Sequence, residues 1–432
     1  MKCRHSKYLI LSSLIFLVIL STCEKNNTPT EITPGDPEIT LSLAEAPRLR
    51  EIRLKAELSN VELPRNFQLS RNDSIILNGQ MTTTVSVLKD TGLTPATEYH
   101  YRSYLLQNSV IADTSNLLQT RTMDTTSHNY IWTVDTIGGI GSVLYDVFAI
   151  AEDDVWAVGD VDTGANQPFN AVHWDGLQWE LERIFFYSCP NGTIPTPYTI
   201  QAIIAFSEND IWFTRGGSFT YWNGNNFQHD CSMNSLLNGS ILKIWGKNSE
   251  DLYAVGYSGT IIRYDGSSWQ KIESGTQLNL TDIWGFPDGL IYIVGSNTST
   301  LENIFLIYDN GQFERFEDAT RRKKGVWGTA PDNLYLVGDG VFTYNGESLN
   351  FIQLPPEIPN YHMESIRGTA ENNIFAVGHF GFVAHYNGST WRYYPELYRY
   401  AIASSVAVIG NSVFVVGTDG SQAFIYVGRR MG

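Results

Sequence analysis

The sequence predicts an all-β protein, in which a small β-sandwich is followed by a seven-bladed β-propeller that an N-terminal strand closes. Three observations lead to this fold class. Aromatic residues make up 13% of the chain and charged residues only 17%, a bias that favours pleated, half-buried strands. A pentapeptide that usually ends in Val-Gly recurs about every 40 residues in the last two thirds of the chain. No part of that region has the apolar spacing of a helix.

The first residues are typical of an export signal. Lys2, Arg4 and Lys7 precede an apolar run over 8–20, which is too short to cross a bilayer core of about 30 Å. The run ends in Leu-Ser-Thr-Cys at Cys23, and this sequence resembles a bacterial lipobox. The resemblance implies an outer-membrane lipoprotein, facing the periplasm or the cell surface. An ordinary secretory signal with an incidental cysteine is the alternative.

The lipobox divides the start of the chain into a signal peptide over 1–22 and a lipidated tether over 23–37. The tether has the Thr- and Pro-rich composition of an extended linker. Two further cysteines remain, Cys189 and Cys231. Because an exported protein meets an oxidising compartment, these two are predicted to form a disulfide, with two free thiols as the alternative.

Residues 38–125 are predicted to form a sandwich of about seven antiparallel strands. The segment from Leu93 to Arg102, Leu-Thr-Pro-Ala-Thr-Glu-Tyr-His-Tyr-Arg, resembles the tyrosine corner of fibronectin type III domains. The resemblance implies a spacer domain, with a binding role as the alternative. The alternating segments expected to be strands include Ile39–Leu43, Ile52–Leu58, Thr84–Leu88 and Tyr99–Leu106.

Residues 126–432 carry the repeats, and a period near 40 predicts four-stranded blades. Each of the first six repeats also contains an Asp-Gly or Asn-Gly pair, such as Asp265-Gly266, which predicts a type I′ hairpin between the third and fourth strands. Trp245, Trp284 and Trp327 share one repeat position and are expected to pack between blades. The seven pentapeptides lie at 155–159, 211–215, 252–256, 291–295, 334–338, 374–378 and 413–417.

The seventh repeat lacks its last strand, because the chain ends soon after Phe424-Ile-Tyr426. The segment 130–137 imitates the missing strand, so it is predicted to pair with the last blade and bring Trp132 close to Tyr426. These repeats resemble the "VwaVG…hydG.sW" propellers of bacterial surface lipoproteins, which are distantly similar to kelch and sialidase-type blades.

The residues offer little sign of catalysis. A net charge of −16 repels phosphate backbones, so nucleic acid is not expected as a partner. The eight histidines show no metal-ligand spacing, and no metal or cofactor is expected. Asp146 and Asp282 share an inner-strand position and are predicted to line the central channel. They could serve a glycan-degrading hydrolase or lyase, although the lining of a solvated channel explains them better.

Recognition is predicted on one face of the propeller, where the loops between second and third strands meet the connections between blades. Those loops vary in length and composition, whereas the turns on the opposite face are short and uniform. A basic cluster over 321–324 stands out in an acidic chain, and it suggests capture of an acidic segment or a solvated loop that balances nearby acids. The candidate residues are Arg321, Arg322, Lys323, Lys324, Tyr187, Tyr198, Tyr361, His362, Tyr398, Arg399 and Tyr400.

These observations together suggest a non-catalytic, lipid-anchored binding protein of the cell envelope, whose propeller face recognises a protein or a polysaccharide. The alternatives are the glycan-degrading enzyme described above and a structural subunit of an envelope complex.

Overall fold

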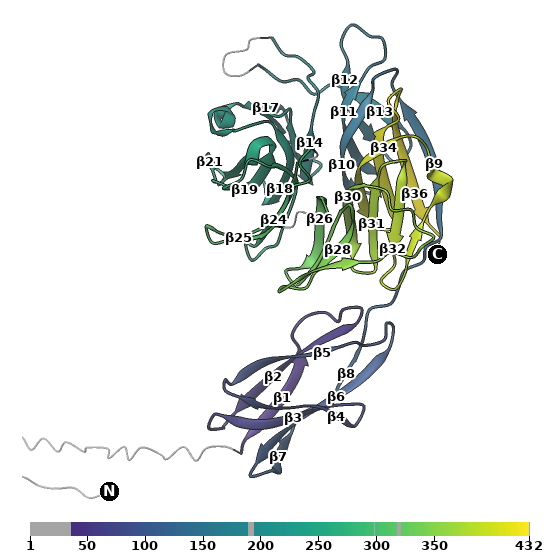
Figure 1. Ribbon diagram of the computed structural model, residues 1–432. Helices are drawn as coiled ribbons and strands as arrows, with labels where there is room; N and C mark the ends of the chain where they lie inside the picture. Colours follow the sequence, from purple (N-terminus) through teal and green to yellow (C-terminus); the bar gives the residue numbers. More distant parts are fainter. Residues whose placement is uncertain (1–35, 189–193, 298, 318–320, 432) are drawn as a thin grey trace, which may run out of the picture. The chain divides into compact units, whose positions relative to one another are not determined.

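The computed structural model describes residues 36–188, 194–297, 299–317 and 321–431, and almost all of its regular structure is antiparallel β-sheet (Figure 1). The predicted signal peptide, Cys23 and Cys189 lie outside these residues, so lipidation and the Cys189–Cys231 disulfide stay predictions. Within the described part of the chain, no helix has the length and apolar character needed to cross a membrane.

The chain separates into two compact units. The first comprises the described residues up to Glu45 together with Arg53–Lys89 and Tyr99–Thr120, and the second comprises Ala46–Ile52, Asp90–Glu98 and the chain from Arg121 onward. The division therefore does not follow a single cut, because two loop segments group with the second unit.

The first unit contains eight strands, one more than expected, in a three-stranded sheet (β1-β2-β5) and a five-stranded sheet (β4-β3-β6-β7, with β8 on β6). Strands β2 and β6 bury every second side chain, as expected for strands with one face in the core, because successive side chains point to opposite faces of a sheet. Tyr101, from the predicted tyrosine corner, is fully buried. The strands are β1 (Glu38–Leu43), β2 (Glu51–Ser59), β3 (Arg65–Arg71), β4 (Ser74–Met81), β5 (Val85–Thr91), β6 (Glu98–Gln107), β7 (Val110–Thr114) and β8 (Leu118–Arg121).

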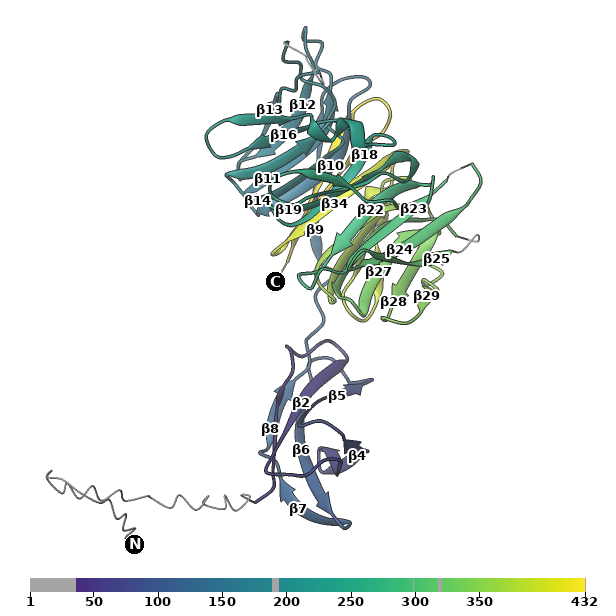
Figure 2. The same cartoon turned by 90° about the vertical axis from the view of Figure 1, so that its left-hand side faces the viewer.

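The second unit is a β-propeller made of antiparallel sheets (Figure 2). Its described strands form seven four-stranded sheets. Six sheets use four consecutive strands each, and the last has the order β34-β35-β36-β9. The first three sheets consist of β10 (Val143–Ala151), β11 (Asp154–Val161), β12 (Phe169–Trp174) and β13 (Trp179–Glu182); β14 (Ala202–Ser207), β15 (Asp210–Thr214), β16 (Phe219–Trp222) and β17 (Phe227–Asp230); and β18 (Ile241–Asn248), β19 (Asp251–Gly256), β20 (Ile261–Tyr264) and β21 (Trp269–Lys271).

The remaining sheets follow the same plan. They consist of β22 (Asn279–Gly285), β23 (Ile291–Ser296), β24 (Asn303–Asp309) and β25 (Gln312–Glu317); β26 (Lys323–Ala330), β27 (Asn333–Gly338), β28 (Gly340–Tyr344) and β29 (Leu349–Ile352); β30 (Met363–Ala370), β31 (Asn373–Gly378), β32 (Phe382–Tyr386) and β33 (Trp391–Tyr393); and β34 (Ile402–Ile409), β35 (Ser412–Thr418), β36 (Ala423–Arg430) and β9 (Tyr130–Ile137). Three short 3-10 helices, η1 (Ser232–Leu236), η2 (Tyr257–Gly259) and η3 (Pro395–Leu397), lie in the connections.

The repeated pentapeptide forms the second strand of each sheet. Steric crowding by the first strand explains why the pentapeptide usually ends in glycine. A Cβ at Gly159 would overlap the carbonyl oxygen of Val143, and a Cβ at Gly378 would overlap that of His362. The first strand thus passes too close to the second for any larger residue.

The tryptophans of the inner strands pack between neighbouring sheets, as expected. The ring of Trp245 covers Gly285 of the next sheet, and the ring of Trp327 likewise covers Gly368. Trp284 donates a hydrogen bond from Nε1 to the carbonyl oxygen of Gly328, at 3.0 Å. The glycine that follows each of these positions therefore makes room for the indole of the preceding sheet.

The predicted pairing of 130–137 with the last sheet is confirmed. Strand β9 pairs with β36 over eight residues, with Trp132 opposite Gly428 and Val134 opposite Tyr426. Tyr130 anchors the start of β9 to the sixth sheet through a hydrogen bond from its hydroxyl to Asn373 Oδ1, at 3.1 Å. This arrangement covers the sheet edge that β36 would otherwise expose.

The predicted type I′ geometry of the Asp-Gly and Asn-Gly turns is wrong for most of them. A type I′ turn needs positive φ at both central residues, and only Asn310-Gly311 has it. In the others the Asp or Asn side chain accepts hydrogen bonds from the amides two and three residues on, as Asp265 does from Ser267 and Ser268. The hydrogen bond from Ser268, which has the largest effect, and those from Ser267 lower the pKa of Asp265 to about 2. A side-chain oxygen thus organises a longer turn.

Two histidines meet where the chain enters β9. His128 Nδ1 lies 2.9 Å from His385 Nδ1 of β32, so one ring must donate the proton that the other accepts. His385 is fully buried and stacks on Phe375. Burial, and then the neighbouring His128, lowers the pKa of His385 from 6.5 to about 2.

Acid should therefore lower the free energy of unfolding of the propeller through His385. Because folded His385 stays neutral while its unfolded counterpart takes up a proton below about pH 6.5, the free energy of unfolding should fall by up to about 1.4 kcal/mol per pH unit below that value. His385→Leu removes this contribution, so urea unfolding at pH 7, 6, 5 and 4 should show a shallower loss for the variant. Parallel pH profiles for the two proteins would contradict this account.

Candidate functional site

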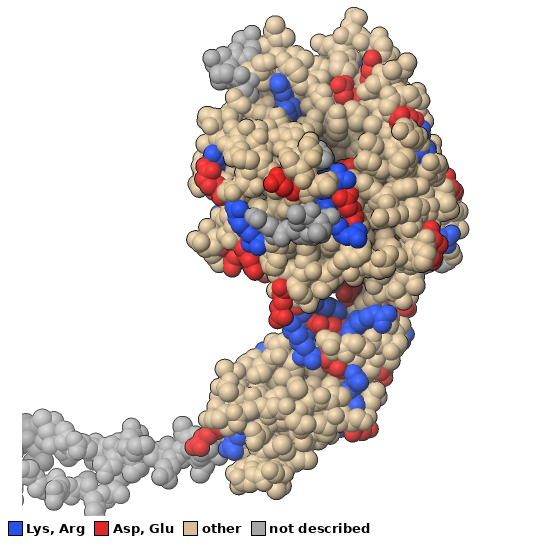
Figure 3. Space-filling model, viewed as in Figure 1, with Lys and Arg blue, Asp and Glu red and all other residues tan. Residues whose placement is uncertain are grey.

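The sheets define one face of the propeller on which the predicted recognition residues gather. In an up-and-down sheet the second-to-third strand connections and those between successive sheets lie at the same ends of the strands; we call this side the loop face. The opposite side, which carries the other hairpin turns, we call the turn face. Positive and negative side chains are interspersed on the visible surface (Figure 3).

Part of the predicted basic cluster lies in an ion-pair cluster of the fifth and sixth sheets. Arg322 contacts both carboxylate oxygens of Asp339 at 2.9 Å, and His362 Nδ1 lies 2.7 Å from Asp339 Oδ1. Although burial acts to raise it, hydrogen bonds from Arg322 and His362 lower the pKa of Asp339 to about 2. Burial lowers the pKa of His362, against the pull of Glu364 and Asp339.

Glu364 holds the other half of the ion-pair cluster. His379 Nε2 lies 3.0 Å from Glu364 Oε1, and Lys324 Nζ lies 3.4 Å from Oε2. Although burial acts to raise it, the hydrogen bond from His379 and the charge of Lys324 lower the pKa of Glu364 to about 2. Within the described residues, no group of three or more His, Cys, Asp or Glu side chains is arranged to hold a metal ion.

The basic cluster as a whole is not the exposed surface that its sequence suggests. Lys323 is fully buried, and its Nζ donates to Asn303 Oδ1 at 2.8 Å and to the carbonyl oxygen of Arg321 at 3.1 Å. The Arg321 guanidinium lies over the ring of Phe351, 4.0 Å from its centroid. The prediction that Lys323 belongs to an exposed binding face is therefore wrong, because its side chain is buried. The ion pairs of Arg322 and Lys324 fit the alternative of a loop that balances nearby acids.

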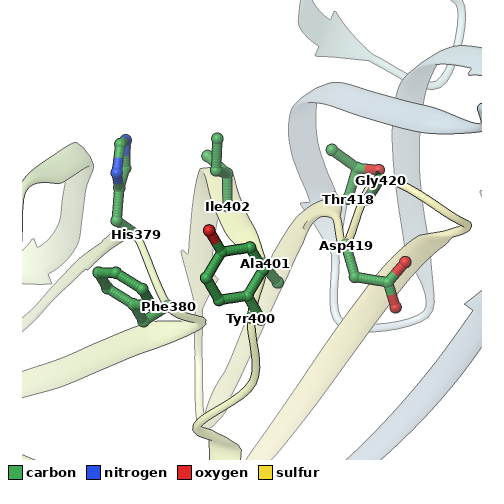
Figure 4. Close-up of a pocket in the computed structure, with 8 residues that line it drawn as sticks. All are labelled: His379, Phe380, Tyr400, Ala401, Ile402, Thr418, Asp419 and Gly420. Carbon is green, nitrogen blue, oxygen red and sulfur yellow. Dashed lines mark hydrogen bonds between the residues drawn. The ribbon is translucent and has the colours of Figure 1, made fainter.

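Next to the ion-pair cluster, the loop face carries an aromatic pocket of about 310 Å³ (Figure 4). His379, Phe380, Tyr400 and Ile402 form one side, and the turn around Asp419 forms the other. Tyr400 is 84% exposed and Ile402 is 41% exposed, which is high for large apolar side chains side by side. This pocket includes Tyr400 from the predicted face and also Phe380, which is not among the predicted residues.

Phe380 joins the pocket to the other predicted tyrosines. Its ring lies 4.7 Å from Tyr361, 5.8 Å from Tyr400 and 6.3 Å from Tyr398, between centroids. The backbone of Phe380 has φ of +62°, which is strained for a bulky residue and costs on the order of 1–3 kcal/mol. Strain of this kind concentrates at ligand-binding positions. In the sequence, the only feature that marks this position is the pair Phe380-Gly381 in a short turn.

The other predicted residues have partners of their own. Arg399 is paired with Asp419 and lies over Phe424. Tyr198 belongs to the first connection between sheets and stacks with Arg215, whose guanidinium carbon lies 3.7 Å from the ring centroid. Tyr187 contacts the ring of His229. Arg399 therefore borders the aromatic pocket, whereas Tyr187 and Tyr198 belong to the region of the first and second sheets.

The channel residue Asp146 is only 1% exposed. Its Oδ1 accepts hydrogen bonds from Lys243 Nζ at 2.5 Å and from Ser405 Oγ at 2.7 Å, and its Oδ2 accepts one from the Ile203 amide at 3.2 Å. These donors come from three other sheets, so Asp146 ties inner strands together.

Asp282 is paired in the same way. Both of its carboxylate oxygens accept from Arg367, at 2.7 and 2.8 Å, and Oδ2 also accepts from the Val326 amide. Although burial acts to lower it, the charge of Asp282 raises the pKa of Arg367. Neither channel carboxylate has the open setting that an acid or base for glycan hydrolysis needs.

Comparisons with known proteins identify the fold. No protein-family model matches the chain. Immune protein Tsi7 from Pseudomonas aeruginosa is 46% identical over 52 residues, which is 12% of this chain and 17% of that protein's length. Among solved structures, YCF48 bound to D1 peptide is similar with a TM-score of 0.54 at 16% identity, over 71% of this chain and 97% of that one.

Two further structures agree. YCF48 from Cyanidioschyzon merolae has a TM-score of 0.52 at 16% identity and covers 68% of this chain and 98% of its own. The RRP9 WD40 repeats have a TM-score of 0.52 at 8% identity and cover 69% and 97%. These likenesses establish a β-propeller.

The pair between Asp282 and Arg367 should matter for stability. Arg367→Met would leave Asp282 as an uncompensated charge at 4% exposure and should lower the free energy of unfolding by about 3 kcal/mol. The double variant Arg367→Met with Asp282→Asn should recover most of that loss, because no buried charge then remains. Urea unfolding of the three proteins tests this; a double variant no more stable than the single one would contradict it.

Proposed function

We propose that the protein is a non-catalytic binding protein whose loop face captures an apolar segment of a partner protein in the aromatic pocket. The observation that carries the proposal is the exposure of Tyr400, at 84%, and of Tyr398, at 54%, beside Phe380. Water-exposed aromatic side chains on a rigid scaffold offer a large contact area at small entropic cost, which is typical of binding hot spots.

The chemistry of the pocket favours a protein segment over the polysaccharide considered from sequence. Ile402 and Phe380 add aliphatic and aromatic surface, which suits insertion of an apolar side chain. The carboxylate of Asp419 is already engaged by Arg399 and by Ser421, so it is a weak anchor for sugar hydroxyls. A protein of the same fold, YCF48, has been solved with a peptide bound.

The wider setting in our proposal is the cell envelope. A lipid on Cys23 would hold the protein at the outer membrane, facing the periplasm or the cell surface, and two or more acyl chains suffice for stable anchoring. The fibronectin type III-like domain would act as a spacer joined to a seven-bladed propeller, with a Cys189–Cys231 disulfide bracing the longest connection of the propeller. A glycan-degrading activity is disfavoured by the ion pairs of Asp146 and Asp282.

Tyr400→Ser should weaken peptide binding at least tenfold. Peptides would first be selected from a displayed random library on the immobilised whole chain, then synthesised and measured by fluorescence anisotropy. Tenfold corresponds to about 1.4 kcal/mol, a modest loss for an aromatic hot spot. Leu177→Ser is the matched control, because Leu177 is 87% exposed but lies in the β12–β13 turn of the turn face.

Two results would overturn the proposed function. One is a library that yields no binding peptide while a polysaccharide array yields a ligand that Tyr400→Ser releases. The other is a set of peptides whose affinity falls equally in the Tyr400→Ser and Leu177→Ser variants.

Cys23→Ser should abolish lipidation. Expressed in a bacterium with a lipoprotein pathway, the variant should no longer incorporate labelled palmitate and should move from the membrane to the soluble fraction, because the thiol that carries the acyl chains is gone. Cys3→Ser is the control, since Cys3 precedes the apolar run. Label retained by the Cys23→Ser protein would refute the lipobox interpretation.

A further inference from the structure

A second cavity lies on the turn face, away from the aromatic pocket. It has a volume of about 400 Å³ and is formed by β15, β16 and β17 of the second sheet and by β20 with the β18–β19 turn of the third. We call it the inter-sheet crevice. The residues that line it include Trp212, Tyr221, Asp230, Glu250 and Tyr264. Because it uses neither the residues nor the face of the proposed function, it can be tested independently.

Aromatic rings make up one wall of the inter-sheet crevice. Trp212 stacks on Tyr221 with centroids 4.6 Å apart and lies 5.6 Å from Tyr264. Trp212 is buried, whereas Tyr221 and Tyr264 are partly exposed. The two tyrosines therefore present ring surface to the cavity from a rigid base, and the negative face of such a ring attracts cations.

Two of the other residues that line the inter-sheet crevice, Asp230 and Glu250, carry carboxylates. Asp230 is held in place by Trp269, whose Nε1 donates to Oδ2 at 2.9 Å, and by the Ser232 amide at 2.8 Å. Glu250 is exposed, and no ion pair or hydrogen bond of its carboxylate is found in the described chain. Asp210, the first residue of β15, has a buried Oδ1 that also lacks a hydrogen-bond partner in the part of the chain that the structure describes.

The carboxylates that line the inter-sheet crevice have no Lys or Arg beside them in the described lining. Burial lowers the pKa of His229, so this lining histidine is neutral at pH 7. Burial first, and then the charges of Asp230, Asp265 and Glu250, raises the pKa of Tyr264, which reports the same excess of negative charge.

We propose that the inter-sheet crevice binds the guanidinium or ammonium group of an arginine or lysine side chain from a partner polypeptide. The cation would lie against the ring of Tyr264, between the carboxylates of Asp230 and Glu250. A cation is the ligand that satisfies both an aromatic wall and carboxylates that no lining Lys or Arg neutralises, and the net charge of −16 would draw it in from solution.

The test uses small probes on the whole chain. Nα-acetyl-L-arginine amide and its lysine analogue are compared with Nα-acetyl-L-citrulline amide, which has the shape of arginine without its charge. Binding is followed by ligand-observed NMR at low salt. The arginine or lysine probe should bind at least about tenfold more tightly than citrulline, and Glu250→Gln should weaken it about threefold or more.

The matched control is Asp153→Asn. Asp153 faces Gly176 in the first sheet as Glu250 faces Gly266 in the third, so it tests the same turn position away from the inter-sheet crevice. Affinity unchanged by Asp153→Asn supports the proposal. It is overturned if citrulline binds as tightly as arginine, if Glu250→Gln has no effect, if free spermidine binds but the amino-acid amides do not, or if a neutral trisaccharide is the better ligand.

Discussion

The pairing of β9 with β36 is the constraint on which the rest of the second unit depends. The last sheet has three consecutive strands, β34, β35 and β36, and its fourth strand is β9, which precedes the first sheet along the chain. Trp132 of β9 covers Gly428 and lies 5.1 Å from Tyr394, while Tyr130 reaches Asn373. These contacts join the two ends of the propeller to the sixth sheet. That sheet supplies Phe380 and borders the aromatic pocket, so the pocket depends on the closed ring.

A uniform scaffold then leaves the faces free to differ. The close approach of first and second strands at Gly159 and Gly378, and the indole rings that cover Gly285 and Gly368, fix the geometry of each sheet. The paired charges of the channel link inner strands that are far apart in sequence. Neither set of residues is available for a ligand. Recognition is thereby left to the connections on the loop face and to the crevices between sheets.

The strands and the closing segment could be predicted from sequence because each depends on a local pattern. Alternating apolar residues, a repeat near 40 and a missing last strand are all visible along the chain. The turn type was missed because Asp265 and its equivalents use side-chain oxygens to hold the next amides, which an Asp-Gly pair alone does not reveal. The burial of Lys323 could not be predicted, because its partner Asn303 and the partners of its neighbours, Asp339 and Glu364, come from other strands and loops.

The aromatic pocket and the inter-sheet crevice could not be predicted from the sequence, for a related reason. The exposure of Tyr400 and the left-handed backbone of Phe380 depend on how two connections meet. Trp212 and Tyr264 occupy repeat positions that suggest packing, and only the arrangement of neighbouring sheets brings them to a cavity with Asp230 and Glu250. Periodicity thus predicts the scaffold well and says little about where neighbouring repeats leave a gap.

Hydrogen–deuterium exchange of β9 tests the central claim most directly. If β9 is an integral strand, those of its amides that donate hydrogen bonds to β36 should be protected to the same degree as the amides of β36, because the two strands separate only when the propeller unfolds. In peptides that cover 130–137, these amides should then exchange in step with those of peptides that cover 423–430. Rapid exchange of β9 while β36 stays protected would show that the ring is not closed by this pairing, and would contradict the account.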